Sequence, residues 1–131
     1  MILDTSVLIE TLRQPPESRV VEMIDRATKD SVRLISVIQV AELCDWAIRE
    51  GVDPEQTVER ALRATLVVPV TRRVAEAAAV LKKERRLEGR AKFGLIDGVI
   101  LATARAYGER VVSLDSDFKD AQDCVVLQAP S

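Results

Sequence analysis

Short apolar runs alternate with longer amphipathic segments along this chain. The runs at residues 2–4, 32–36, 66–70, 110–114 and 124–127 have the length and composition of buried β-strands. Between them, apolar positions recur at helical spacing in residues 5–12, 19–29, 37–50, 54–64, 72–87 and 95–107. Strands that alternate with helices predict an α/β fold, in which a mainly parallel sheet is covered on both faces to give a three-layer α/β/α sandwich.

Several residues mark where these helices begin and end. Ser18 and Thr71 are suited to cap the helices that follow them, and Asp53 precedes a proline at a first helical position. Gly51 follows the apolar pattern of residues 37–50, where a residue with positive φ is expected. Pro15 and Pro16 end the first helix. These signals predict short connections and no long linker.

The chain has the size and composition of one globular domain, expected to span residues 1–131. Apolar residues make up 47% and charged residues 31% of its 131 residues. No apolar run approaches the roughly 18 residues that span a membrane, and no signal peptide is recognised at the N-terminus. Cys44 and Cys124 stand alone, without metal-finger spacing. A cytoplasmic protein with reduced thiols and no membrane association is expected.

The charge is unevenly distributed, and histidine is absent. Without histidine, Ser-His-Asp and Cys-His nucleophiles and histidine-ligated zinc are excluded. Residues 72–92 hold eight basic and three acidic side chains, a net +5 in a chain whose net charge is −2. This basic segment is a candidate for binding a polyanion. The alternative is a solvated helix face of mixed charge.

Four acidic residues occupy unusual positions. Asp4 ends the first predicted strand and Asp115 directly follows the fourth, at the sheet edge where parallel α/β folds bind ligands. Glu42 and Asp97 lie within apolar helical segments and have no Lys or Arg at i±3 or i±4. Taken singly, each acid fits a cap, a turn or a salt bridge. Taken together, converging carboxylates without basic partners indicate a hard cation, Mg²⁺ or Mn²⁺.

These acids lie within longer stretches that resemble a known family. The N-terminal "ILDTSVLIE", the "AEL" that contains Glu42, and "LIDGVILATARAYGERVVSLDSDF" are similar to PIN domains, and most like the VapC-like ribonuclease toxins of type II toxin–antitoxin pairs. The resemblance implies four catalytic acids, Asp4, Glu42, Asp97 and Asp115. It implies metal ligands at Asp4, Asp97 and Asp115 with Asp117 as a secondary acid, and polar groups beside the metal at Ser6 and Ser113. Ser113 replaces the commoner Thr and keeps the hydroxyl.

The function that this resemblance implies is Mg²⁺-dependent hydrolysis of RNA phosphodiester bonds, with Mn²⁺ as a possible substitute. Within the basic segment, Lys83, Arg86 and Lys92 are the candidate RNA-binding residues. Family members form homodimers and bind an antitoxin, so both partners are expected here. The apolar content of residues 37–48 and 8–12 exceeds what one sheet face requires, which also favours a homodimer.

Three alternatives keep the acidic crevice but change its role. A receiver-like phosphoacceptor domain needs paired acids after the first strand and a Lys after a late strand, whereas Asp4 is followed by Thr5 and Ser6. A haloacid-dehalogenase-like phosphatase needs a D-x-D-x-T pattern, which the first strand lacks. A non-catalytic PIN-like module that binds RNA or protein is opposed by the presence of all four acids.

Overall fold

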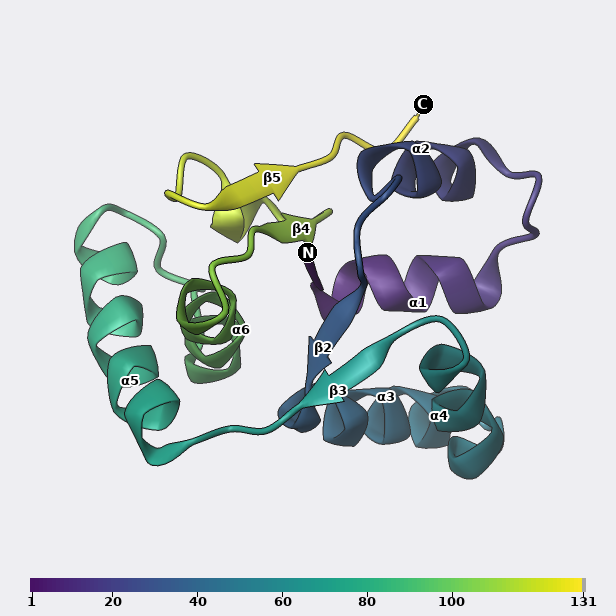
Figure 1. The fold of residues 1–131 in the computed structure, drawn as a ribbon, viewed down its shortest axis with the longest axis horizontal. Coiled ribbons are helices and arrows are strands. Elements are labelled where there is room, and N and C mark those ends of the chain that lie inside the picture. The colour runs from purple at the N-terminus through teal and green to yellow at the C-terminus, as the bar shows by residue number, and fades with distance from the viewer. Residues whose placement is uncertain (131) are drawn as a thin grey trace.

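The computed structural model describes residues 1–130, which form a five-stranded sheet between two layers of helices (Figure 1). The strand order is β3-β2-β1-β4-β5, and every neighbouring pair is parallel, so the sheet is parallel throughout. The first strand lies at the centre, which places the residue after it at the middle of the sheet's carboxyl edge. The strands are β1 (Ile2–Leu3), β2 (Leu34–Ser36), β3 (Leu66–Val68), β4 (Val111–Ser113) and β5 (Cys124–Val126).

Alternation of side chains along the strands divides the core into two parts. Ile2 packs into a cluster with residues of the last two long helices, whereas Leu3 packs into a second cluster with residues of the first four. The predicted α/β/α sandwich is therefore confirmed. The helices are α1 (Thr5–Arg13), α2 (Arg19–Ala27), α3 (Val37–Glu50), α4 (Pro54–Leu62), α5 (Arg72–Leu87) and α6 (Leu95–Ala106), with a 3₁₀ turn η1 (Ser116–Phe118).

The predicted helix boundaries are largely correct. The side chains of Ser18, Asp53 and Thr71 accept hydrogen bonds from backbone N–H groups in the first turns of α2, α4 and α5. Gly51 ends α3 with a φ of 73°, in the left-handed region that glycine adopts without strain. The strands are shorter than the apolar runs suggested, because ladder pairing covers only two or three residues of each run.

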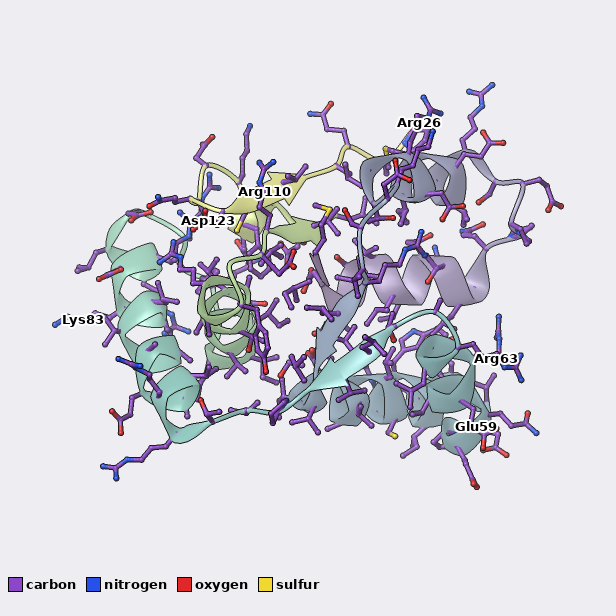
Figure 2. The ribbon with its side chains drawn as sticks, in the orientation of Figure 1. Arg26, Glu59, Arg63, Lys83, Arg110 and Asp123 are labelled. Atoms are coloured by element: carbon purple, nitrogen blue, oxygen red, sulfur yellow. The ribbon has the colours of Figure 1, made fainter. Side chains whose placement is uncertain are left out.

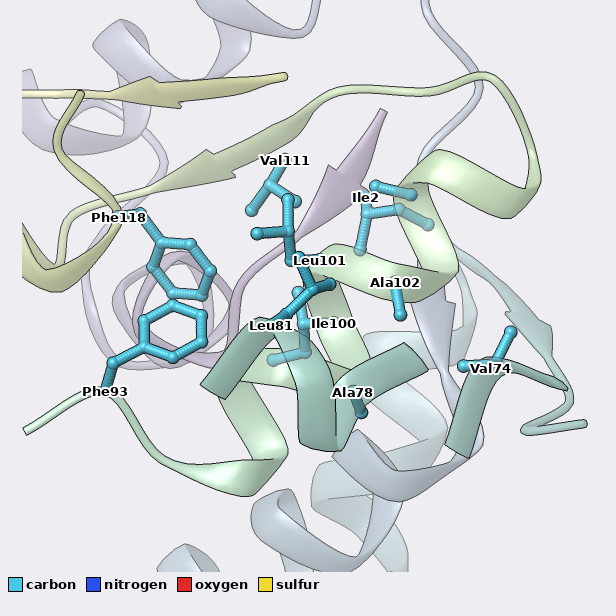
Figure 3. Close-up of a cluster of buried hydrophobic side chains, with 11 residues drawn as sticks. Ile2, Val74, Ala78, Leu81, Phe93, Ile100, Leu101, Ala102, Val111 and Phe118 are labelled. Carbon is cyan, nitrogen blue, oxygen red and sulfur yellow. The ribbon is translucent and has the colours of Figure 1, made fainter. Parts of the chain in front are cut away.

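Helices α5 and α6 lie side by side and in backbone contact. A Cβ atom at Gly98 would lie 2.4 Å from the carbonyl oxygen of Ala78, so only glycine fits at that crossing. In the same core cluster, the rings of Phe93 and Phe118 meet edge to face with centroids 5.5 Å apart (Figure 3). This packing fixes α6, and with it Asp97, against the sheet.

Arg85 of the basic segment is a buried structural residue, only 5% exposed. Its guanidinium donates to Glu88 and to the carbonyl oxygens of Asp117 and Lys119, each at 2.7–2.8 Å. It also lies 5.7 Å from the centre of the Phe93 ring. Arg85 therefore joins α5 to the turn after β4, and it is not available to bind a polyanion.

Within residues 1–130, every helix is too short or too polar to serve as a membrane span.

Candidate active site

A pocket of about 480 Å³ opens beyond the carboxyl ends of β1 and β4. Acidic, hydroxyl and apolar side chains line it, and they come from the ends of those strands and from α1, α3 and α6. All four acids predicted to be catalytic are among them. The lining residues are Asp4, Thr5, Ser6, Ile9, Ile38, Ala41, Glu42, Asp45, Trp46, Arg49, Ile96, Asp97 and Asp115.

Asp4 is the most deeply buried of these acids, at 5% exposure. It occupies the N-cap position of α1, but its side chain makes no capping hydrogen bond. Its Oδ2 instead accepts from the hydroxyls of Ser6 at 2.7 Å and Ser113 at 2.6 Å. Burial raises the pKa of Asp4, while the two serine hydroxyls act in the opposite direction. A simple capping role for Asp4 is therefore wrong.

Ser6 and Ser113 connect Asp4 to the turn that carries Asp115. The backbone N–H of Leu114 donates to Ser6 Oγ at 3.1 Å, and that of Asp115 donates to Ser113 Oγ at 2.9 Å. The two serine hydroxyls thus donate to the Asp4 carboxylate. Their oxygens also accept hydrogen bonds from the backbone next to the Asp115 carboxylate. A role for these two hydroxyls beside a metal ion stays a prediction.

Asp115 and Asp117 differ in where they lie. Asp115 lines the pocket, and its Oδ1 accepts from the backbone N–H of Asp117 at 2.9 Å. Asp117 is not a lining residue, and its carbonyl oxygen accepts from buried Arg85. The structure therefore brings Asp115 to the site and places Asp117 in the loop behind it. Direct metal binding by Asp117 stays a prediction.

Glu42 is half-buried on α3 and is oriented by a residue that the sequence did not reveal. Thr5 donates its hydroxyl to Glu42 Oε1 at 2.5 Å. Gln39, one turn earlier on α3 and fully buried, donates to the Leu3 carbonyl at 2.6 Å and to Thr5 Oγ1 at 3.3 Å. Burial raises the pKa of Glu42, opposed by the Thr5 hydrogen bond and reinforced by the charge of Asp4.

Asp97 lies in the first turn of α6, where its Oδ2 accepts the backbone N–H of Gly94 at 2.8 Å. Burial is the main cause that raises its pKa to about 6. The negative charges of Asp4, Asp115 and Glu42 raise the pKa further. Asp97 thus responds to the other three acids, which shows that the four carboxylates share one electrostatic environment.

The donor set fits a hard divalent cation. Carboxylate and hydroxyl oxygens suit Mg²⁺, which commonly binds one or two carboxylates and keeps several of its waters. Within residues 1–130, however, no three Asp, Glu or Cys side chains lie close enough together to hold a metal ion by themselves. The carboxylates surround a space instead. Metal binding by Asp4, Asp97 and Asp115 stays a prediction.

The predicted RNA-binding residues lie outside the pocket. Lys83 projects from α5 away from the rest of the molecule (Figure 2). Arg86 donates to the Phe93 carbonyl at 3.0 Å, and Lys92 is exposed in the loop before α6. None of the three lines the pocket. The basic residue that does so is Arg49, from the last turn of α3.

Helical spacing could have identified Arg49, because it lies seven residues after Glu42 on the same face of α3. Thr5 and Gln39 were harder to find. Their roles depend on contacts between the end of β1 and α3, and no local pattern encodes such contacts.

The match to known proteins agrees with this geometry. Residues 1–123 match the sequence model of the PIN domain. The chain belongs to the PIN domain family. This membership decides against the receiver-domain and phosphatase alternatives. A comparison with curated protein sequences found no match.

Similar solved structures are found among toxin–antitoxin proteins. A toxin–antitoxin complex from Klebsiella pneumoniae has a TM-score of 0.74 at 24% identity, covering 95% of both chains. FitAcB from Neisseria gonorrhoeae has a TM-score of 0.69 at 27% identity, covering 98% of this chain and 97% of the other. VapC20 of Mycobacterium tuberculosis, a sarcin–ricin loop cleaving toxin, has a TM-score of 0.70 at 19% identity, covering 98% of both chains.

Proposed function

We propose that this protein is a Mg²⁺-dependent endoribonuclease and the toxin of a type II toxin–antitoxin pair, acting in the cytoplasm. The observation that supports this most strongly is the placement of Asp4, Glu42, Asp97 and Asp115 around one pocket at the sheet's carboxyl edge. A purely structural role would leave such acids apart or paired with cations. The solved toxin that cleaves the sarcin–ricin loop shares the fold, and this supports RNA as the substrate.

The chain's own residues have distinct tasks in this reaction. Asp4, Asp97 and Asp115 would hold the cation. Ser6 and Ser113 keep Asp4 oriented through their hydrogen bonds to its Oδ2. Glu42, oriented by Thr5, faces the pocket as a carboxylate able to bind the ion or accept a water proton. When bound, Mg²⁺ supplies an activated water and stabilises charge on the phosphate.

A cleavage assay tests the proposal. The purified protein should cut RNA with Mg²⁺ or Mn²⁺ and lose all activity in chelator. Asp97→Asn should remove most of the activity, because it deletes a charge at the cation site. Asp25→Asn is the control, since Asp25 pairs with Arg33 on the surface at 2.7 Å. Full activity in chelator would overturn the proposal, and RNA binding without cleavage would establish the non-catalytic alternative.

An antitoxin is the proposed protein partner. Several similar solved structures are toxin–antitoxin complexes, and three similar structures contain bound DNA. The acidic pocket would accept an arginine from a small inhibitory partner, since a guanidinium binds carboxylates bidentately. Co-expression with the small protein of the adjacent gene should yield a stable complex without nuclease activity. Retention of full activity in that complex would contradict this role.

We also propose a homodimer, with α3 as part of its interface. Val37 and Ile48 on this helix are 46% and 66% exposed, which leaves apolar surface uncovered. Residues 8–12 do not supply the other half of the argument, because Leu8 is buried and both Ile9 and Leu12 pack against the core. Light scattering should give twice the monomer mass. A monomer at high concentration would exclude the dimer.

A further inference from the structure

One face of α3 extends from the acidic centre of the pocket to its rim. The lining residues of this helix recur three or four positions apart, so they lie on a single stripe. At 1.5 Å per residue, Arg49 lies about 10 Å along the helix axis from Glu42. The stripe comprises Ile38, Ala41, Glu42, Asp45, Trp46 and Arg49.

Trp46 is not explained by core packing. It is the single tryptophan of the chain and is only half-buried. It belongs to neither hydrophobic cluster, although Ile9, which lines the same pocket, packs against one of them. A large aromatic side chain that lines a pocket and stays outside the core is available to contact a ligand.

Arg49 is the one basic residue among the pocket lining within the described chain. Its Nε lies 3.4 Å from Asp45 Oδ2, and its side chain remains 68% exposed. Such a surface pair is weak, because both groups stay hydrated. The guanidinium therefore keeps free N–H donors for a phosphate. A polyanion that approaches four carboxylates needs a cation of this kind to offset repulsion.

We infer that Trp46 and Arg49 form a nucleotide-binding rim for single-stranded RNA, with one base stacked on the indole and a phosphate held by the guanidinium. This rests on the proposed function, whose substrate it specifies. Stacking needs an unpaired base, so a single strand or loop fits where a duplex does not. Both residues would contact the RNA itself, at a distance along α3 from the phosphate that is cleaved.

Binding is measured in the Asp97→Asn background with Mg²⁺ present, so that the RNA stays intact. Because Trp46 is the only tryptophan, its emission reports directly on the rim. An unlabelled single-stranded RNA decamer should change this emission in a saturable way. An abasic decamer of equal length should bind through its phosphates and leave the emission unchanged. Identical changes with both oligomers would overturn the stacking assignment.

Anisotropy of a labelled decamer gives the affinity of each variant. Trp46→Ala should weaken binding roughly 5- to 150-fold, and Trp46→Phe should restore most of it. Arg49→Gln should lower the slope of log affinity against log salt by about one. Arg13→Gln is its matched control, because Arg13 pairs with Glu10 at 3.0 Å and lies outside the pocket. Glu50→Gln, at an exposed position of the same helix that does not line the pocket, controls for changes in α3.

Steady-state cleavage in the otherwise native chain separates the two proposals. The rim variants should raise KM with little change in kcat, because they act on substrate binding. If the native protein cleaves RNA and the Trp46 and Arg49 variants bind and cleave like it, the rim is wrong and the nuclease stands. If the native protein never cleaves but the variants lose binding, the nuclease is wrong and the rim stands. Melting temperatures of the Trp46 and Arg49 variants equal to that of the native protein exclude misfolding. If Trp46→Ala fails to fold, Trp46→Phe is measured in its place.

Discussion

Asp4 and Arg85 are both only 5% exposed, yet their surroundings differ in kind. Arg85 has an anionic partner in Glu88, two backbone carbonyls and an aromatic ring. Asp4 has two neutral hydroxyls and lies near other acids. One buried charge is compensated within the protein, and the other is not. A compensated charge supports the fold, whereas an uncompensated one remains available for a ligand.

The largest expected effect concerns the uncompensated charge. Asp4→Asn should reduce metal-dependent RNA cleavage more than about 100-fold, since even residues that orient metal ligands contribute 10- to 100-fold. Melting experiments should show that the variant stays folded, because an asparagine side chain can keep hydrogen bonds to Ser6 and Ser113. Near-native activity would remove Asp4 from the catalytic centre.

Removal of the compensated charge, that of Arg85, should lower stability and leave the active site intact. Arg85→Met should lower the free energy of unfolding by about 2–4 kcal/mol, because the carbonyls of Asp117 and Lys119 lose their donor. Urea denaturation measures this loss, with Arg13→Met as the exposed control. Once folded, the variant should bind Mg²⁺ as the native protein does. A stability change below 0.5 kcal/mol would mean that Arg85 is dispensable.

The acidic cluster should make metal-free stability depend on pH. The pKa of Asp97 is raised to about 6 from its ordinary value of 3.8, so the folded state binds more protons between these pH values than the unfolded state does. The free energy of unfolding should therefore fall as pH rises from about 4 to 6, and the full penalty persists at pH 7. Asp97→Asn should recover about 1 kcal/mol at pH 7 after allowance for solvent screening. Thermal melts in chelator across this pH range provide the measurement.

In the native protein, Mg²⁺ should offset the loss of stability that the ionised carboxylates cause at neutral pH. Binding at a hundredfold excess over the dissociation constant stabilises the folded state by about 2.7 kcal/mol. The melting temperature of the Asp97→Asn variant should respond much less. A variant clearly less stable than the native protein in chelator would instead assign Asp97 a structural role through its hydrogen bond from Gly94.

The smallest effect is expected from the exposed lysines of the basic segment. If Lys83 and Lys92 hold RNA phosphates, each Lys→Gln change should reduce the salt slope of RNA binding by about one. Metal affinity should not change, because neither residue lines the pocket. An unchanged slope would identify this segment as a solvated helix face.

The sequence predicted the parts of this structure that depend on local pattern. Strand ends, caps and the four acids around the pocket follow from periodicity, from residue type and from the family resemblance. The role of Arg85 was not predictable, because its position in α5 resembles that of the neighbouring basic residues. The carbonyl groups that Arg85 binds, those of Asp117 and Lys119, belong to the turn after β4, which is distant in sequence. Thr5 and Gln39 were missed for the same reason, since their hydrogen bonds join segments distant in sequence.

The close contact between Gly98 and Ala78 also has a consequence for metal preference. Gly98 follows Asp97 directly, so a larger residue at position 98 would push α6 away from α5 and move Asp97 relative to Asp4. The separation of these carboxylates is thus controlled from a helix face outside the pocket. Because Mg²⁺ requires shorter and more regular coordination than larger cations, we expect the ion preference of the proposed site to depend on the packing of α6 against α5 as well as on the ligands themselves.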